Sequence, residues 1–232
     1  MTSWASWYKK SWFKYRRALR NSTPGPMQDF YQAALPAPGT RVHDVEFVAL
    51  DFETTGLNPE ADHIISFGLV HVRQLAIVLD SAWHGIVFTP RDMPEDSAVI
   101  HHITDDTVAN GMSIPELMPL LLKQLRGKVL LVHHAQLELG FLNKICHNLY
   151  QQGFHLPVVD TEVLARRRLQ RRGVSIKSGA LRLFNLRTHY HLPEYTAHQA
   201  LSDAIATAEL FLAQAAESCP KQNCKLKQLV TG

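Results

Sequence analysis

Cysteine is scarce in this chain of 232 residues, which contains Cys146, Cys219 and Cys224 and no CxxC spacing. An odd number without that spacing argues against a structural zinc site and against a disulfide framework, so we expect a reducing, cytoplasmic setting. Long hydrophobic runs are also absent, and no segment is long enough to span a bilayer. The first residues lack the apolar stretch and small-residue cleavage site of a signal peptide.

Acidic residues are missing from the start of the chain, where none precedes Asp29. The basic residues there are Lys9, Lys10, Lys14, Arg16, Arg17 and Arg20. A second basic cluster consists of Arg166, Arg167, Arg168, Arg171, Arg172, Lys177, Arg182 and Arg187. The net charge is only +3, but such clustering suits a polyanionic partner such as nucleic acid. A solvated helix face explains either cluster equally well.

Three regions can be separated along the chain. Residues 1–44 carry aromatic and basic side chains at helical spacing and then a Pro-rich linker or wrapped, irregular segment at 21–45. Residues 45–218 form the main domain, and 219–232 form a basic tail. The first helix could pack on the domain, lie on a membrane surface, or bind a protein or nucleic acid. We favour packing, because so many exposed aromatic side chains would promote aggregation.

Hydrophobic periodicity predicts an α/β domain with a mixed sheet. Alternating and Val/Ile-rich segments predict strands at 46–52, 62–72, 76–88 and 129–133. Apolar residues at helical spacing predict helices at 114–125, 137–151, 161–172, 178–185 and 198–216. Three strands followed by alternating helix and strand are typical of this fold class.

Two acids close the first predicted strand. In Val-Ala-Leu-Asp-Phe-Glu-Thr-Thr-Gly-Leu at 48–57, Asp51 and Glu53 precede a Thr-Thr-Gly turn. Side chains at positions i and i+2 of a strand point to one face, so the two carboxylates lie side by side. Such a pair is costly unless a cation lies between its members. Oxygen ligands suit Mg²⁺ or Mn²⁺, which indicates a metal site for phosphate chemistry.

Two later segments supply further candidate groups. Glu138 falls in the first turn of a helix that follows the strand ending at His133, so its carboxylate can point toward the strand ends. His198 and Asp203 stand at the start of the last long helix, where His198 can reach out while Asp203 faces the sheet. Taken alone, Glu138 could be an acid favoured by the helix dipole, and His198 a capping residue.

Three segments in this order resemble the DEDDh 3′–5′ exonuclease family. They are Asp-Phe-Glu-Thr-Thr-Gly at 51–56, His-His-Ala-Gln-Leu-Glu-Leu-Gly-Phe-Leu at 133–142 and His-Gln-Ala-Leu-Ser-Asp at 198–203. The resemblance covers about residues 45–216. The family includes the proofreading subunit of bacterial replicative polymerases, oligoribonuclease, RNase T and the TREX enzymes. The resemblance implies a ribonuclease H-like fold, with a mixed central sheet of about five strands flanked by helices.

The resemblance also implies a catalytic centre with two divalent ions, Mg²⁺ or Mn²⁺, about 4 Å apart. Asp51 would bridge both ions, and Glu53 and Asp203 would complete the site of the first. Glu138 would hold or orient the second ion. His198 would act as general base on the attacking water, a task that suits an unperturbed histidine pKa of about 6.5. The expected products are nucleoside 5′-monophosphates.

Substrate contacts follow from the same resemblance, position by position. The turn after the acids would offer backbone N–H groups to the 3′-OH and phosphate, Leu57 would wedge between bases, and Phe141 would stack on a base or line the pocket. The implied contacts are Thr54, Thr55, Gly56, Leu57, His101, Ile103, His134, Ala135 and Phe141.

Two positions depart from the family pattern. Glu138 stands where the family has Asp, and the additional methylene moves the carboxylate if the backbone stays in place. We therefore expect robust activity with Mn²⁺ and weaker activity with Mg²⁺. His102 replaces a family glycine and introduces a bulky side chain into that loop.

The leading hypothesis is a metal-dependent 3′–5′ exonuclease that acts on single-stranded ends, with DNA favoured, in proofreading or repair. The alternatives are an oligoribonuclease-like enzyme for short RNA and a non-catalytic module that binds nucleic acid or a polymerase. The four carboxylates and His198 are chemically competent, which favours an enzyme. A polymerase or another protein partner could bind through the N-terminal helix.

Overall fold

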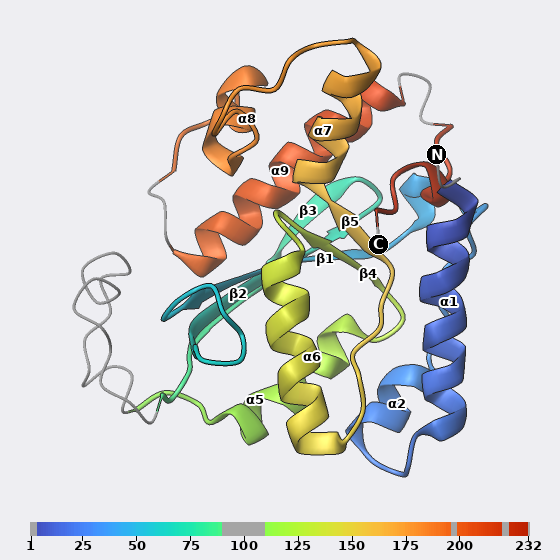
Figure 1. Ribbon diagram of the computed structural model, residues 1–232, viewed down its shortest axis with the longest axis vertical. Coiled ribbons are helices and arrows are strands. Elements are labelled where there is room, and N and C mark those ends of the chain that lie inside the picture. Colours follow the sequence, from blue (N-terminus) through green and yellow to red (C-terminus); the bar gives the residue numbers. More distant parts are fainter. Residues whose placement is uncertain (1–3, 90–109, 196–198, 220–222, 232) are drawn as a thin grey trace.

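A five-stranded mixed sheet, covered by helices on both faces, forms the centre of the fold (Figure 1). The computed structural model describes residues 4–89, 110–195, 199–219 and 223–231. The strand order is β3-β2-β1-β4-β5, with β2 antiparallel to both neighbours and β1, β4 and β5 parallel. The strands are β1 (Phe47–Thr54), β2 (Ile64–Arg73), β3 (Ala76–Ile86), β4 (Val129–Val132) and β5 (Val158–Asp160). The predicted α/β fold with a mixed sheet is confirmed.

The helices largely follow the predicted ranges. They are α1 (Trp4–Asn21), α2 (Pro26–Gln32), α5 (Ile114–Leu125), α6 (Gln136–Tyr150), α7 (Thr161–Arg171), α8 (Leu183–His189) and α9 (Ala200–Ser218), with 3₁₀ turns at Val42–Asp44 and Leu226–Gln228. The helix predicted at 178–185 is wrong in position, because turns occupy 178–182 and the helix begins at Leu183. Within the described ranges, no helix combines the length and apolar character needed to cross a membrane.

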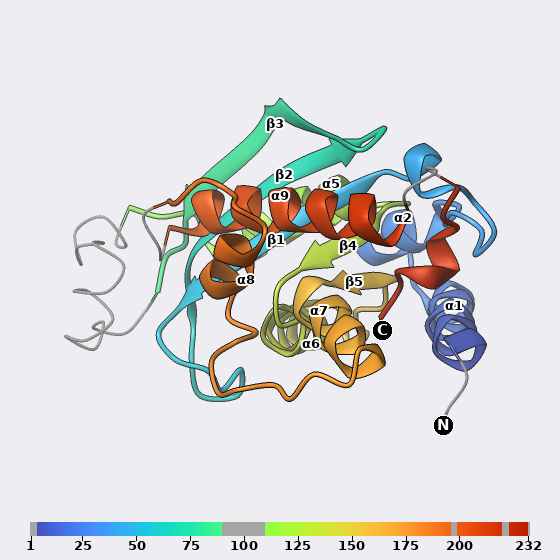
Figure 2. The same ribbon diagram turned by 90° about the horizontal axis from the view of Figure 1, so that it is seen from above.

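Strand β1 separates two hydrophobic cores. Its residues 48, 50 and 52 pack with side chains of α2, α5 and α6 in one core. Its residues 47 and 49 pack with α9 and the C-terminal segment in the other. Because strand side chains alternate between faces, Asp51 and Glu53 continue the series that faces α9. Figure 2 shows α9 running across this face of the sheet.

Helix α9 approaches the sheet closely at Gly68 of β2. A Cβ atom on Gly68 would lie 2.1 Å from the backbone nitrogen of Leu201, so only glycine allows this contact. The facing side of the helix also uses small residues, since Ala200, Ala204 and Ala208 are fully buried. The backbone of α9 therefore lies almost directly on the sheet.

The N-terminal region packs on the domain. Tyr15 of α1 is buried, and its hydroxyl donates to the carbonyl oxygens of Phe30 at 2.8 Å and Ala33 at 3.1 Å. Tyr31 of α2 is also buried, and its hydroxyl donates to the Gly153 carbonyl at 2.6 Å. The expected packing of the first helix is confirmed at Tyr15, while the expectation of an irregular segment missed α2.

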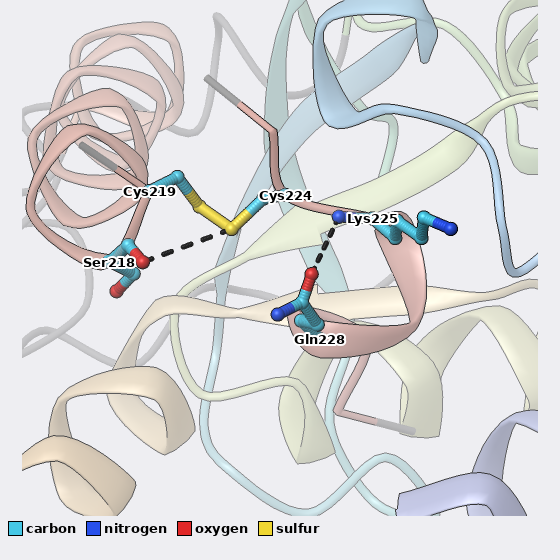
Figure 3. Close-up of a disulfide and its surroundings, with 5 residues drawn as sticks. All are labelled: Ser218, Cys219, Cys224, Lys225 and Gln228. Atoms are coloured by element: carbon cyan, nitrogen blue, oxygen red, sulfur yellow. Dashed lines mark hydrogen bonds between the residues drawn. A yellow bond between two sulfur atoms is a disulfide. The ribbon is translucent and has the colours of Figure 1, made fainter. Parts of the chain in front are cut away.

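The C-terminal segment contains a disulfide, although the cysteine number and spacing argued against a disulfide framework. Cys219, at the end of α9, is bonded to Cys224, with a Cα–Cα distance of 5.5 Å (Figure 3). The chain reverses after α9, and the Val42 N–H donates to the Cys224 carbonyl at 2.9 Å, which holds the returning segment on the domain. Sequence spacing could not reveal this return. The cysteine argument for a reducing compartment therefore loses its support.

Replacement of Gly68 by alanine tests the close contact of α9 with the sheet. The new methyl group must displace α9, and we expect the unfolding free energy to fall by about 1–3 kcal/mol, the usual cost of overpacking. Urea denaturation measures this change. Gly39→Ala is the control, because a Cβ there meets nothing within 4 Å. Equal stabilities of the two variants would show that the contact is not tight.

Candidate active site

Three carboxylates from β1 and α9 converge at one edge of the sheet. Asp51, Glu53 and Asp203 each offer an oxygen, and these oxygens all lie within 4.8 Å of one another. Glu53 and Asp203 are buried, with 6% and 8% of their surface exposed, whereas Asp51 keeps partial exposure. The strand alternation of β1 and the close approach of α9 together produce this cluster.

Glu138 adds a fourth carboxylate from the first turn of α6. It is 1% exposed, and its Oε2 atom has no hydrogen-bond partner among the described residues. Burial is the main cause that raises the pKa of Glu138 to about 8. Burial also raises the pKa of Asp51 well above its usual value, followed by the charges of Glu138, Glu53 and Asp203. Glu138 therefore acts on Asp51 electrostatically, although it is not part of the three-residue cluster.

The four carboxylates fit a divalent cation. Like charges held this close in a partly desolvated site disfavour ionisation, and a cation between them removes that cost. All potential ligands are carboxylate oxygens, the donor type that Mg²⁺ and Mn²⁺ prefer. The unpartnered Oε2 of Glu138 leaves an acceptor available for a cation or its bound water.

Asp160 organises the backbone around Glu138, a role that the sequence analysis missed. Its carboxylate accepts from the backbone N–H groups of His134 at 3.2 Å and Ala135 at 2.9 Å, just before α6. The same carboxylate caps α7 by accepting from the N–H groups of Glu162 and Val163. One side chain thus fixes the starts of two helices. An Asp-Thr pair before a helix is a recognisable capping signal that could have indicated the α7 cap.

The turn after β1 is held by its own side chains. The Thr54 hydroxyl donates to the Gly56 carbonyl at 2.7 Å, and the Thr55 N–H donates to the His63 carbonyl at 2.9 Å. A Cβ on Gly56 would collide with the Asp62 carboxylate, so the turn requires glycine. Beyond this turn Leu57 is 83% exposed, next to the carboxylates in sequence.

The other implied substrate residues fall in different environments. His134 is exposed, adopts a φ of 70°, and its Nδ1 lies 2.8 Å from a carboxylate oxygen of Glu162. Phe141 is 2% exposed and packs in the hydrophobic core with Leu142 and Cys146. His101, Ile103 and His198 lie outside the described residues, and so does His102.

A buried arginine anchors the segment that leads toward His198, and sequence reasoning assigned Arg187 only to a basic cluster. Arg187 is 2% exposed and donates to the Pro193 carbonyl at 2.6 Å. It also pairs with Glu209 of α9 at 2.7 Å and lies 4.8 Å from the ring centre of Tyr195. These contacts tie residues 193–195 to α9, which carries Asp203.

The raised pKa of Glu138 predicts a pH dependence of stability in the metal-free protein. The folded-state pKa of about 8 exceeds the ordinary value of 4.5, so folding favours the protonated form. The stabilisation from protonated Glu138 is fully present below pH 4.5 and is lost as the pH rises through about 8. We expect the unfolding free energy of chelator-treated protein to fall across this interval, and to fall less in Glu138→Gln.

Urea denaturation at a series of pH values measures this effect. Glu60→Gln, which removes an exposed acid from a loop, is the control and should retain the fall seen in the unmodified protein. Parallel curves for Glu138→Gln and the unmodified protein would contradict the assignment.

Structural comparison places the fold among known nucleases. The nuclease domain of 3′hExo, a DEDDh family member solved with bound rAMP, matches with a TM-score of 0.65 and 17% identity, over 78% of this chain and 96% of that chain. This likeness concerns the fold, which is of the ribonuclease H-like exonuclease type.

Sequence comparison identifies the relatives. DNA polymerase III subunit epsilon of Treponema pallidum is 34% identical over 183 residues, which cover 78% of this chain and 82% of that protein. DNA polymerase III PolC-type of Thermotoga maritima is 33% identical over 169 residues, which cover 73% of this chain but only 12% of that protein. The family model described as Exonuclease matches residues 48–211. The chain therefore belongs to this exonuclease family.

Proposed function

We propose that the protein is a metal-dependent 3′–5′ exonuclease that releases nucleoside 5′-monophosphates from single-stranded 3′ ends. The observation that carries the proposal is the convergence of Asp51, Glu53 and Asp203, whose oxygens lie within 4.8 Å of one another. Buried Glu138, which acts electrostatically on Asp51, strengthens the proposal, because ionising all four carboxylates together calls for more than one positive charge.

Each of the five residues has a role in this proposal. Asp51, Glu53 and Asp203 would hold divalent ions, and Glu138 would hold or orient the second of two. Such ions lower the pKa of bound water and offset charge on the phosphate during in-line displacement. His198 accepts the proton of the attacking water. The water oxygen bonds to phosphorus, the bond from phosphorus to the 3′ oxygen breaks, and the leaving oxygen takes a proton from solvent water.

The names of the relatives favour DNA as the substrate. Both sequence relatives are named for DNA polymerase III, so we propose a role in replication proofreading or repair and a polymerase as a partner. Helix α1 offers an exposed surface for such a partner, where Phe13 is 67% exposed beside exposed Lys14, Arg16 and Arg17. A cytoplasmic location is part of the same proposal.

Removal of one metal-binding carboxylate tests the catalytic centre. We expect Asp51→Asn and Asp203→Asn to lose hydrolysis of a 3′-labelled oligonucleotide, and His198→Ala to lose about 10²–10⁴-fold as a general base does. A chelator should abolish activity in the unmodified protein. Glu60→Gln, outside the cluster, is the matched control. Comparison of 3′ and 5′ labels gives the direction, and the absence of cleavage of both DNA and RNA would refute an exonuclease.

Substitution of Glu138 tests the metal preference. We expect stronger activity with Mn²⁺ than with Mg²⁺, because the longer side chain displaces the carboxylate from the family position. Glu138→Asp should narrow the difference, and Glu138→Ala should be inactive with both ions. Hydrolysis rates measured across a titration of Mg²⁺ and of Mn²⁺ test this preference. Equal rates with Mg²⁺ and Mn²⁺ in the unmodified protein would count against the proposed metal preference.

A further inference from the structure

An open pocket of about 560 Å³ lies between α7 and the segment that precedes α8. Its lining includes His133 and His134, which follow β4, and Arg166 of α7. It also includes Lys177 and Arg182 from the turns before α8. The lining therefore holds three cationic side chains, those of Arg166, Lys177 and Arg182, and one acid, Glu162.

The pocket lies at the carboxyl end of β4, the strand next to the one that carries Asp51 and Glu53. Strand β4 pairs in parallel with β1, and Leu131 is aligned with Ala49. Asp160 links this end of β4 to Glu138: its carboxylate accepts from the His134 N–H at 3.2 Å, and its charge acts on Glu138. Because His134 also lines the pocket, a ligand could extend from Glu138 past Asp160 and His134 into it.

The structure divides the arginine cluster that the sequence presents as one unit. Arg168 and Arg172 pair with Glu217 of α9 at 2.7 and 3.0 Å, and Arg167 donates to the Val230 carbonyl at 3.2 Å. These arginines fasten α7 to neighbouring segments. Arg166, Lys177 and Arg182 instead line the pocket, and of these three Arg166 is paired with Glu162.

The acid at the pocket is already engaged. Glu162 contacts His134 Nδ1 at 2.8 Å and Arg166 at 2.5 Å. Lys177 and Arg182 are exposed and make no ion pair with any other described residue. Both cations are therefore available to an external anion.

A tight turn presents these two cations together. The Ala180 N–H donates to the Lys177 carbonyl at 3.1 Å, and the Arg182 N–H donates to the Gly179 carbonyl at 3.0 Å. Gly179 has a φ of 76°, which is unfavourable for other residues. The turn fixes the backbone that carries Lys177 and Arg182.

We propose that this pocket binds backbone phosphates of the substrate strand on the 5′ side of its terminal nucleotides, through Lys177 and Arg182. The inference rests on the proposed function and identifies where the strand leaves the carboxylates. A polyanion is repelled by the acidic cluster, and cations placed along its path offset that repulsion. An open pocket lined by more than one exposed cation suits a chain of phosphates better than a single small anion.

The double variant Lys177→Ala/Arg182→Ala tests the pocket. The assay compares a single-stranded oligonucleotide of about 15 nucleotides with the p-nitrophenyl ester of thymidine 5′-monophosphate, which has no upstream nucleotide. We expect the ratio of kcat/KM for the oligonucleotide to that for the ester to fall about tenfold at low salt, equivalent to about 1.4 kcal/mol. The ratio is insensitive to a general loss of active protein.

Arg171→Ala/Lys227→Ala is the matched control, because it removes two exposed cations that do not line the pocket. Its ratio should stay that of the unmodified protein. Fluorescence anisotropy gives a second measure: the salt slope for oligonucleotide binding should fall by about 1.4 in the pocket variant, for two contacts at about 0.7 each. An unchanged ratio and slope would overturn the proposal.

Failure of the proposed function has a different signature. If the unmodified protein hydrolyses neither substrate, the exonuclease proposal fails, but the binding measurement still decides whether the pocket contacts nucleic acid. Weaker oligonucleotide binding by the pocket variant, but not by the control variant, would support phosphate binding in the pocket. Equal oligonucleotide binding by the two variants would refute it.

Discussion

The close contact between α9 and β2 at Gly68 is the constraint on which the carboxylate cluster depends. The acids of β1 are placed by strand alternation alone, but Asp203 belongs to a helix more than 100 residues later in the chain. It reaches them because the α9 backbone rests on a glycine and buries alanines against the sheet. A larger side chain at this contact would hold the helix, and its carboxylate, away from the other acids.

The crowding of these carboxylates destabilises the folded state of the metal-free protein. The buried and partly buried acids crowd one edge of the sheet, and the raised pKa values of Asp51 and Glu138 reflect the cost. The two well-packed cores on either side of β1 offset that cost. The Asp160 carboxylate holds the backbone just before α6. Glu138 therefore cannot easily move away from the other acids to reduce the repulsion.

Local patterns made much of the structure predictable. The alternation of β1 and the acids at its end are contained in a few residues, and α5 matches its predicted range in full. Strand β5 has only three residues, too few to show an alternation of hydrophobic and polar side chains. It forms because β4 pairs with it. Gly179 interrupts an apolar pattern that otherwise suited a helix at 178–185. The contact of Arg168 with Glu217, and the return that joins Cys219 to Cys224, depend on segments that meet only in the folded chain.

The C-terminal segment closes the open side of β5. Thr231 donates its N–H to the Val158 carbonyl at 2.8 Å, and its hydroxyl accepts from the Asp160 N–H at 2.9 Å. Figure 1 shows this end of the chain beside β5. Unpaired outer strands invite intermolecular pairing, so the tail acts as a guard against self-association through the sheet.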